Sequence, residues 1–241
     1  MIHSADTYDQ ILKSGNAFLQ LPFIAIGMIL GTRLILARAR FWKMPQQHKD
    51  WVLLSAVLGA MVGSTLPAFF AGEIIESRAV QYLITPKTML GGLLGSFFAV
   101  ALTKKFLKTH EETADSFALG GILALAVGRI GCFFGHCCYG IPFSWGFNFG
   151  DGIPRFPTQL LEASLLFLSF AVFYTLEKHQ VLKDRLLFLF FSWYGMLRFF
   201  LEYLRQPISK TVLGFGFYQC LALSVMGLGV YQLIRRRLAM H

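Results

Sequence analysis

Four polar side chains recur along one strongly apolar stretch of this sequence. Tyr194, Arg198, Glu202 and Arg205 are spaced by four, four and three residues through and just beyond Leu186–Leu204. Residues at such intervals share one face of a helix. A charged side chain within a membrane-spanning helix is costly unless it faces a partner or a polar cavity. The stripe therefore predicts a polar interior, and the simpler alternative is a structural ion pair between Arg198 and Glu202.

A second polar group occupies two other apolar stretches. Arg129 is followed by Cys132 three residues later and by His136 seven residues later, a spacing that predicts one helix face. Gln159 and Glu162 are three residues apart near the start of the next stretch. We expect these side chains to face the same interior as the stripe.

Arginines outnumber acids among the interior candidates, which are Arg33, Arg129, Arg198, Arg205, Glu162 and Glu202. Even if both acids are paired, an uncompensated arginine in a low-dielectric site requires an anion. A guanidinium matches a phosphate or carboxylate through two parallel hydrogen bonds. The abundant anion of a bilayer is the phospholipid phosphate, so the pattern predicts a headgroup site. Arg33 and Arg205 could instead extend to the membrane interface.

The elements that must position these residues are transmembrane helices. The 241 residues are 55% hydrophobic and 15% charged, whereas soluble domains carry about 25% charged residues. A span needs about 20 mostly apolar residues. We therefore expect an all-α polytopic membrane protein that forms a single transmembrane domain over residues 1–241. The seven predicted spans are Ala17–Ala37, Trp51–Ala71, Thr88–Thr103, Phe117–Phe134, Thr158–Leu176, Leu186–Leu204 and Val212–Ile234.

The net charge of +9 follows an alternating pattern along the chain. Lysine and arginine concentrate in the segments that follow the first, third, fifth and seventh spans. The positive-inside rule then predicts an external N-terminus and a cytoplasmic C-terminus. This topology explains the basic charge without a nucleic-acid partner, and anionic lipid headgroups would also favour the basic loops.

Glycines and one aromatic loop lie close to the polar positions. Gly91 and Gly92 stand in the third span, where they either allow close helix packing or open the backbone to a ligand. In the loop at residues 140–157, Trp145, Phe147 and Phe149 alternate, which predicts an extended segment at the membrane interface. Gly150-Asp-Gly is a turn signal. This external loop is expected to act as a lid over the cavity.

The cysteines do not form a disulfide framework. Cys132, Cys137 and Cys138 cluster around His136, whereas Cys220 lies alone in the last span and is expected to be a small core residue. Partly polar helix-end packing, a redox or disulfide role and a metal site all remain open for the cluster. No second cysteine pair closes a tetrahedral zinc site, so neither a metal nor a cofactor is expected.

Three blocks of this sequence resemble one bacterial enzyme family. They are Gly128-Arg-Ile-Gly131 followed by Gly140, then Pro154-Arg-Phe-Pro-Thr-Gln-Leu-Leu-Glu162, and finally Tyr194-Gly-x-x-Arg198 with Glu202 and Arg205-Gln-Pro207. Together with Gly91-Gly-Leu-Leu-Gly95, they are similar to prolipoprotein diacylglyceryl transferase over residues 88–207. Seven spans with an external N-terminus also match that family.

The resemblance implies an enzyme of the bacterial cytoplasmic membrane that uses phosphatidylglycerol. The family transfers a diacylglyceryl group to the thiol of a lipobox cysteine in a secreted precursor. Arg129 and Arg198 match the two family arginines around the phosphate, and Tyr194 and Gly140 match a tyrosine and a glycine of the same motifs. We expect the protein to act as a monomer on these two substrates.

Three family positions are changed in this chain. Leu90 stands where the family has a histidine before Gly-Gly-Leu, Cys132 replaces an asparagine, and Cys137 replaces an acidic residue. The parts that hold the lipid are retained, while parts tied to attack and orientation differ. This pattern is typical of a divergent member or paralogue rather than of the housekeeping enzyme.

Three hypotheses for the function follow. The first is a phospholipid-dependent transferase, with His136 or Glu162 as the general base in place of the missing histidine. The second is a non-catalytic phospholipid-binding protein, and the third is a membrane thiol or metal protein that uses the cysteine cluster. The predicted catalytic residues are Arg129, Arg198, Tyr194, His136 and Glu162. The predicted substrate-binding residues are Gly91, Gly92, Gly140, Cys132, Gln159, Glu202 and Arg205.

Overall fold

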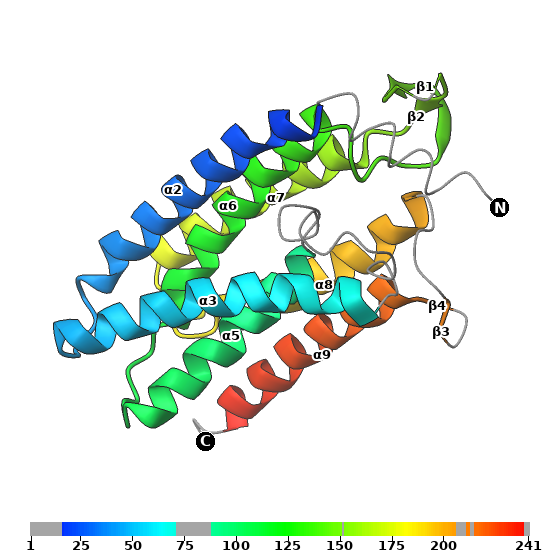
Figure 1. Ribbon diagram of the computed structural model, residues 1–241. Coiled ribbons are helices and arrows are strands. Elements are labelled where there is room, and N and C mark those ends of the chain that lie inside the picture. The colour runs from blue at the N-terminus through cyan, green and yellow to red at the C-terminus, as the bar shows by residue number, and fades with distance from the viewer. Residues whose placement is uncertain (1–15, 71–87, 151, 206–210, 213–214, 239–241) are drawn as a thin grey trace. The chain divides into compact units, whose positions relative to one another are not determined.

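The computed structural model describes residues 16–70, 88–150, 152–205, 211–212 and 215–238 (Figure 1). Within these residues, seven helices are long and apolar enough to cross a membrane, as the sequence predicts. The first five helical elements are η1 (Asn16–Leu19), α2 (Gln20–Ala39), α3 (Gln46–Phe70), α5 (Met89–Phe106) and α6 (Ala114–Phe134). The remaining helices are α7 (Thr158–Lys178), α8 (Leu186–Leu201), η2 (Glu202–Leu204) and α9 (Phe217–Leu238).

Most helix boundaries differ from the prediction by two to five residues, and at two of them the backbone changes its geometry. The seventh span was expected from Val212, but Val212 belongs to β3 (Thr211–Val212), which pairs with β4 (Phe215–Gly216) before α9 begins. The α-helix of the sixth span ends at Leu201 and tightens into the 3₁₀ turn η2. Apolar composition marks where a chain can cross a membrane, but it does not register such changes of backbone geometry.

The described chain divides into two compact units. The first unit comprises η1, α2, α6, α7, η2 and the hairpin of β1 (Pro142–Asn148) and β2 (Pro154–Arg155). The second comprises α3, α5, β3, β4, α9 and residues 188–199 of α8. The expectation of a single domain over residues 1–241 stays a prediction, as does the orientation of the termini.

Helix α6 organises the first unit. It runs beside α7, and α2 packs against it through Gly27 and Gly31 (Figure 1). A Cβ added at Gly31 would lie 2.6 Å from the backbone oxygen of Gly120, so only glycine allows this approach. At the C-terminal end of α2, the Arg38 Nε–H donates a hydrogen bond to the Glu177 carboxylate in the last turn of α7, at 2.6 Å. The three helices therefore form a close-packed frame around the polar residues of α6 and α7.

The start of α8 depends on a residue of α6. The carboxylate of Asp115 accepts hydrogen bonds from the backbone N–H groups of Asp184 at 2.6 Å and Leu186 at 2.8 Å. The first N–H groups of a helix have no partner within the helix. Asp115 supplies that partner and places a negative charge at the positive end of the helix dipole.

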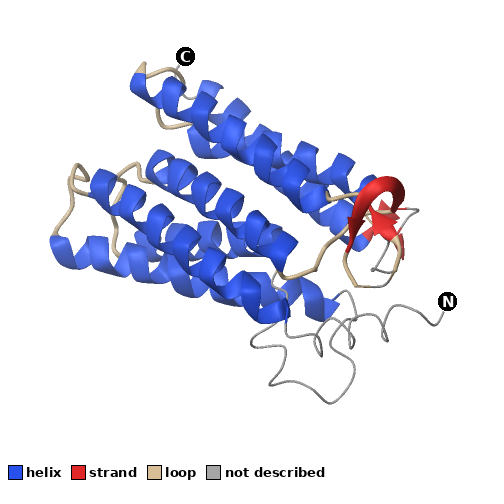
Figure 2. Ribbon diagram, turned by 90° about the horizontal axis from the view of Figure 1, so that it is seen from above, coloured by secondary structure: helices blue, strands red, loops and turns tan. Residues whose placement is uncertain are grey.

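The predicted extended loop is a β-hairpin beyond the ends of the first unit's helices, drawn red in Figure 2. Trp145 is 88% exposed and Phe147 48% exposed, while Phe149 just after the strand is buried. The side-chain oxygen of Asn148 accepts the N–H groups of Gly150 at 2.9 Å and Gly152 at 3.1 Å. Both glycines have positive φ, a backbone region that glycine favours, and Asp151 between them lies outside the described residues.

Glycine packing holds the helix pair α3–α5 in the second unit. A Cβ at Gly91 would collide with the Gly63 backbone and come within 2.6 Å of the Pro67 ring. A Cβ at Gly95 would come within 2.7 Å of the Gly63 Cα. Thr88 joins the two helices at the start of α5, because its hydroxyl donates to the Ser64 carbonyl at 3.1 Å.

Candidate functional site

A buried ion pair links α6 and α7. The Nε atom of Arg129 lies 2.9 Å from a carboxylate oxygen of Glu162, and the two side chains are 5% and 2% exposed. Arg129 is one turn before Cys132, and its Nη1 atom lies 4.0 Å from the Cys132 Sγ atom. The sequence predicted that these residues face a common interior, and the structure brings all three together.

Gln159 completes the polar face of α7. Its side-chain amide donates to the Cys137 carbonyl at 2.6 Å, while within the described residues its Oε1 atom has no hydrogen-bond partner. Gln159 is only 1% exposed. A buried acceptor without a donor is costly, so the geometry leaves a position for a hydroxyl or N–H group of a ligand.

The chain turns sharply after α6 and folds back on the helix end. His136 and Cys138 have φ values of 52° and 61°, a region that non-glycine residues rarely occupy. The N–H of Cys137 donates to the Cys132 carbonyl at 3.1 Å, and the Thr158 hydroxyl donates to the Cys138 carbonyl at 2.7 Å. Strained backbone that is fixed from both sides is typical of a functional position.

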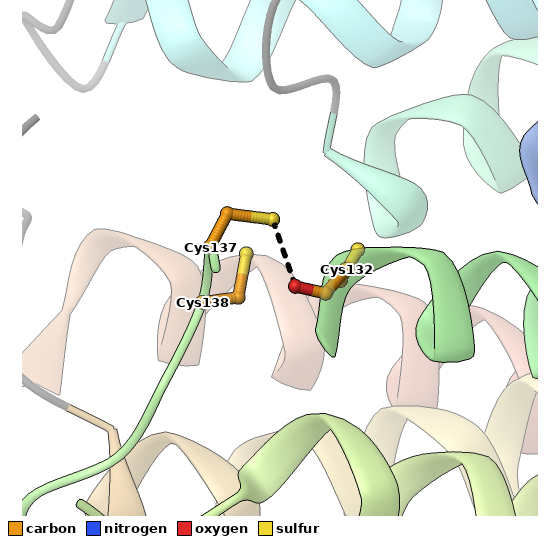
Figure 3. Close-up of side chains that lie close together, drawn as sticks. All are labelled: Cys132, Cys137 and Cys138. Atoms are coloured by element: carbon orange, nitrogen blue, oxygen red, sulfur yellow. Dashed lines mark hydrogen bonds between the residues drawn. The ribbon is translucent and has the colours of Figure 1, made fainter. Parts of the chain in front are cut away.

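The turn brings three thiols together. Cys132 extends from the end of α6, and Cys137 and Cys138 extend from the turn toward it (Figure 3). All three sulfur atoms lie within 4.8 Å of one another. The three cysteines are reduced and half-buried. The sequence spacing suggested that these cysteines lie near one another. Their sulfur atoms converge because His136 and Cys138 adopt positive φ in the turn.

The thiols of the turn differ in acidity. Hydrogen bonds from the Cys132 and Cys137 thiols, together with the charges of Arg205 and Arg129, hold the pKa of Cys138 well below its usual range. The hydrogen bonds with Cys132 and Cys138, and burial, raise the pKa of Cys137. These contacts therefore favour the thiolate form more at Cys138 than at Cys137.

His136 does not occupy the predicted place on the helix face. Helix α6 ends at Phe134, so His136 lies in the turn rather than two helical turns beyond Arg129. Its Nδ1 atom lies 3.0 Å from the Phe149 carbonyl oxygen, and its ring meets the edge of the Phe149 ring. A carbonyl oxygen can accept a hydrogen bond but cannot donate one. In the neutral ring Nδ1 therefore carries the proton, and Nε2 is the basic nitrogen.

Gly140 joins three segments of the first unit. Its N–H donates to the Phe156 carbonyl at 2.9 Å, and the next N–H, of Ile141, donates to the Leu204 carbonyl at 3.0 Å. A Cβ at Gly140 would lie 2.6 Å from the Leu204 carbonyl oxygen. Gly140 therefore acts through close backbone packing that ties the turn after α6 to the segment after α8.

The predicted stripe on α8 is only partly helical. Tyr194 and Arg198 lie in the α-helix and are buried, but Glu202 opens the 3₁₀ turn and Arg205 is extended. The carboxylate of Glu202 lies 3.4 Å from the Nη1 atom of Arg205. The stripe of four residues on a single α-helix is therefore wrong at its C-terminal end, where the change of helix type rotates Arg205 into a β-bridge with Gly140.

Tyr194 and Arg198 are placed within the second unit. The Tyr194 hydroxyl donates to the Met89 sulfur at 3.7 Å, and its ring stacks on Phe190. Leu90, the residue after Met89, is 3% exposed. Tyr194 thus lies at the start of α5, beside the segment that begins with Leu90 and Gly91.

The sequence profile described as prolipoprotein diacylglyceryl transferase matches residues 22–235. This chain belongs to the prolipoprotein diacylglyceryl transferase family. The family is one of transferase enzymes of the bacterial inner membrane, in keeping with the seven membrane-spanning helices described here.

Curated relatives extend the match over most of the chain. The phosphatidylglycerol–prolipoprotein diacylglyceryl transferase of Nitratidesulfovibrio vulgaris is 31% identical over 231 residues, or 88% of this chain and 84% of the relative. The enzyme of the same name from Roseobacter denitrificans is 30% identical, covering 88% of this chain and 87% of the relative. That of Idiomarina loihiensis is 29% identical, covering 83% and 84%. The recognition made from the motifs is confirmed.

One buried residue near the site was absent from the predictions. Arg155 of β2 is buried, and its guanidinium lies 5.0 Å from the centre of the Tyr139 ring. Tyr139 in turn stacks on Phe149. The sequence did offer a signal for this contact, because Arg155 stands among aromatic residues and an arginine over an aromatic ring is the usual form of a cation–π contact. Arg33, in contrast, is exposed on α2.

Proposed function

We propose that this protein transfers a diacylglyceryl group from phosphatidylglycerol to the thiol of a prolipoprotein cysteine. The new thioether bond replaces the bond between the diacylglyceryl carbon and a phosphate oxygen, so glycerol phosphate leaves. Family membership supports the reaction type. The single observation that carries the proposal is the buried Arg129, which is paired with Glu162 within two otherwise apolar membrane helices.

Arg129 and Arg198 would bind the phosphate and stabilise its charge as it leaves. Glu162 engages Arg129 through Nε, so the Nη edge of the guanidinium is directed toward Cys132 and the turn. A guanidinium has five donors and can serve a carboxylate and a phosphate at once. Donors aimed at developing negative charge in a site without water are usually the largest contribution to catalysis.

The headgroup glycerol would bind at Gln159. Its buried Oε1 atom is an acceptor, and the glycerol of phosphatidylglycerol carries two hydroxyl donors. Phospholipids with a choline headgroup have no donor to offer at this position. Discrimination for a hydroxylated headgroup would then follow, because a headgroup without donors leaves the amide oxygen unpaired.

His136 is the better of the two candidate bases. The carboxylate of Glu162 is committed to Arg129, whereas the Phe149 carbonyl fixes the tautomer of His136 so that Nε2 is basic. The imidazole would accept the proton of the incoming thiol. Tyr194 and the family histidine position now held by Leu90 lie together in the second unit.

The proposal is tested with purified protein in detergent, labelled phosphatidylglycerol and a lipobox peptide. Arg129→Ala and Arg198→Ala should each abolish formation of the lipidated peptide, and lysine at either position should rescue it only partly. Arg33→Ala on the exposed face of α2 is the matched control and should behave as the wild type. Normal turnover by both alanine variants would exclude the headgroup site.

A double variant separates catalysis from folding. Arg129→Ala alone leaves the Glu162 carboxylate buried without its partner, which is expected to destabilise the protein. Arg129→Gln combined with Glu162→Gln removes both charges and keeps two polar side chains of similar size. If Arg129 binds phosphate, the double variant folds but neither binds nor turns over the lipid. Lipid binding without turnover by the wild type would instead support the non-catalytic alternative.

We expect the protein to replace the housekeeping enzyme poorly. Leu90 can neither accept a proton nor hydrogen-bond a headgroup, and general acid–base help is worth about 10²–10⁴-fold in rate. The measurements are complementation of a strain depleted of its own transferase and the activity of His136→Ala. Full complementation together with an unaffected His136→Ala variant would contradict the proposed base.

The topology and oligomeric state belong to the same proposal. A reporter fused after His241 should be cytoplasmic, and a cysteine at Asp151, which lies outside the described residues, should react with an impermeant reagent from outside. Light scattering should give the mass of a monomer. A cytoplasmic Asp151 would contradict both the number of spans and the role of residues 140–157 as an external lid.

A further inference from the structure

The cysteine cluster of the first unit has the properties of a metal site. The sulfur atoms of Cys132, Cys137 and Cys138 lie within 4.8 Å of one another, and all three cysteines are half-buried and reduced. They come from two short segments that hydrogen bonds hold in place. The N–H of Cys137 donates to the Cys132 carbonyl, and Figure 3 shows the Cys137 thiol donating to the same carbonyl oxygen. We propose that these three thiols bind one soft monovalent metal ion, Cu(I), with three-coordinate sulfur ligation.

The distances between the sulfur atoms fit a trigonal site. A metal–thiolate bond of about 2.3 Å places three ligands at 120° roughly 4.0 Å apart. The sulfur atoms need to move together by less than about 1 Å from their present separations.

The ligand set selects Cu(I) over Zn(II). Within the described residues, the group of possible ligands contains three cysteines and no histidine or carboxylate. The nearby His136 is turned with Nδ1 toward the Phe149 carbonyl. Structural zinc takes four ligands in a tetrahedron, whereas Cu(I) is a soft ion that three thiolates can bind in a trigonal arrangement. Three sulfur atoms therefore leave zinc one ligand short.

Positive charge beside the cluster favours thiolate ligation. The Arg129 Nη1 atom lies 4.0 Å from the Cys132 sulfur, and Arg205 forms a β-bridge with Gly140, two residues after Cys138. Metal ligation requires deprotonated thiols, and three thiolates with one Cu(I) carry a net negative charge. Arginines at this position offset part of that charge. This inference does not depend on the proposed transferase activity, because its tests measure bound metal and free thiols.

The experiment titrates fully reduced protein with Cu(I) without oxygen, in competition with a chromogenic Cu(I) chelator. The expected result is one Cu(I) per chain for the wild type and at least a hundredfold weaker binding for Cys132→Ser, Cys137→Ser and Cys138→Ser. Cys220→Ser is the matched control, since Cys220 lies in α9 outside the cluster, and it should bind as the wild type. Zn(II) alone should bind more weakly than Cu(I).

Two measurements on the wild-type protein avoid variants that fail to fold. X-ray absorption of the copper-loaded protein should show three sulfur neighbours and no nitrogen or oxygen neighbour. Cu(I) should protect three of the four cysteines from alkylation. The proposal is overturned if protein with all four thiols reduced binds no Cu(I), or if Cys138→Ser binds Cu(I) as tightly as the wild type does. It is also overturned if the cluster holds a disulfide that the reductant does not open.

Discussion

The helix pairs α3–α5 and α6–α7 are held together by opposite kinds of residue. In α3–α5 the contact is made by Gly63, Gly91 and Gly95, which bring two backbones together. In α6–α7 the contact contains a buried ion pair of Arg129 and Glu162. Glycine packing fixes geometry through shape alone, whereas the ion pair holds charges that a substrate can use. One pair therefore provides rigidity, and the other places chemistry inside the membrane.

The largest expected effect comes from breaking the ion pair of α6–α7. Glu162→Gln leaves the Arg129 charge buried without its carboxylate, which should lower the free energy of unfolding by about 3–5 kcal/mol. Glu177→Gln is the matched control, because Glu177 also lies on α7 but pairs with Arg38 in a half-exposed position. That change should cost no more than about 1 kcal/mol. Thermal unfolding in detergent measures both, and equal effects would remove the contrast between buried and exposed pairs.

The second prediction concerns position 90 at the start of α5, the helix that packs against α3 through glycines. Leu90→His restores the family residue at the start of α5, next to the Met89 sulfur that accepts the Tyr194 hydroxyl. Turnover of phosphatidylglycerol should rise by about tenfold to a hundredfold, the lower part of the usual range for acid–base help. Leu90→Gln, which is polar but does not titrate near neutral pH, is the control. If both variants gain equally, proton transfer is not what position 90 lacks.

The third prediction uses two adjacent glycines. Gly91→Ala should push α3 and α5 apart and cost about 1–3 kcal/mol, because its Cβ collides with the Gly63 backbone. Gly92→Ala should be nearly neutral, because its Cβ would meet its nearest neighbour, the Ala60 carbonyl oxygen, at 3.5 Å. Unfolding temperatures compare the two. A Gly92→Ala variant that is stable but has lost turnover would support the predicted role of Gly92 in substrate binding.

The smallest effect concerns the acidity of the turn after α6. The depressed pKa of Cys138 means that its thiolate persists at lower pH than that of an ordinary cysteine. Alkylation of Cys138 should therefore continue below pH 8, where unperturbed thiols with a pKa of about 8.5 react slowly. Mass spectrometry after alkylation at several pH values measures this. Arg205→Gln should shift the profile to higher pH, and a profile unchanged by this variant would show that the arginine charge does not set the acidity.

The sequence was sufficient to predict elements that depend on local composition. All seven spans, the extended aromatic segment and the polar face of Gln159 and Glu162 follow from apolar length and residue spacing. The family also follows, since Arg129 and Arg198 occur in ordered motifs on separate spans.

Features that depend on changes of backbone direction were not predictable. Helix α6 ends two residues before His136, and α8 tightens at Glu202, although the composition changes little at either place. Non-glycine residues with positive φ carry no compositional signal, so the return of Cys138 toward Cys132 could not be foreseen. The roles of the predicted site residues in binding and catalysis stay predictions.

The contact between Asp115 and the start of α8 also has a consequence for biogenesis. The N–H groups at the start of α8 bind a carboxylate of the earlier helix α6. If α8 left the translocon without α6 beside it, these groups would lack that partner. Because Asp115 is synthesised about 70 residues before Leu186, the earlier helix is already in the membrane and can receive the later one. Docking of the segment that carries Arg198 would thereby be aided by the segment that carries Arg129. The order of synthesis would then guide the assembly of the two arginine-bearing helices.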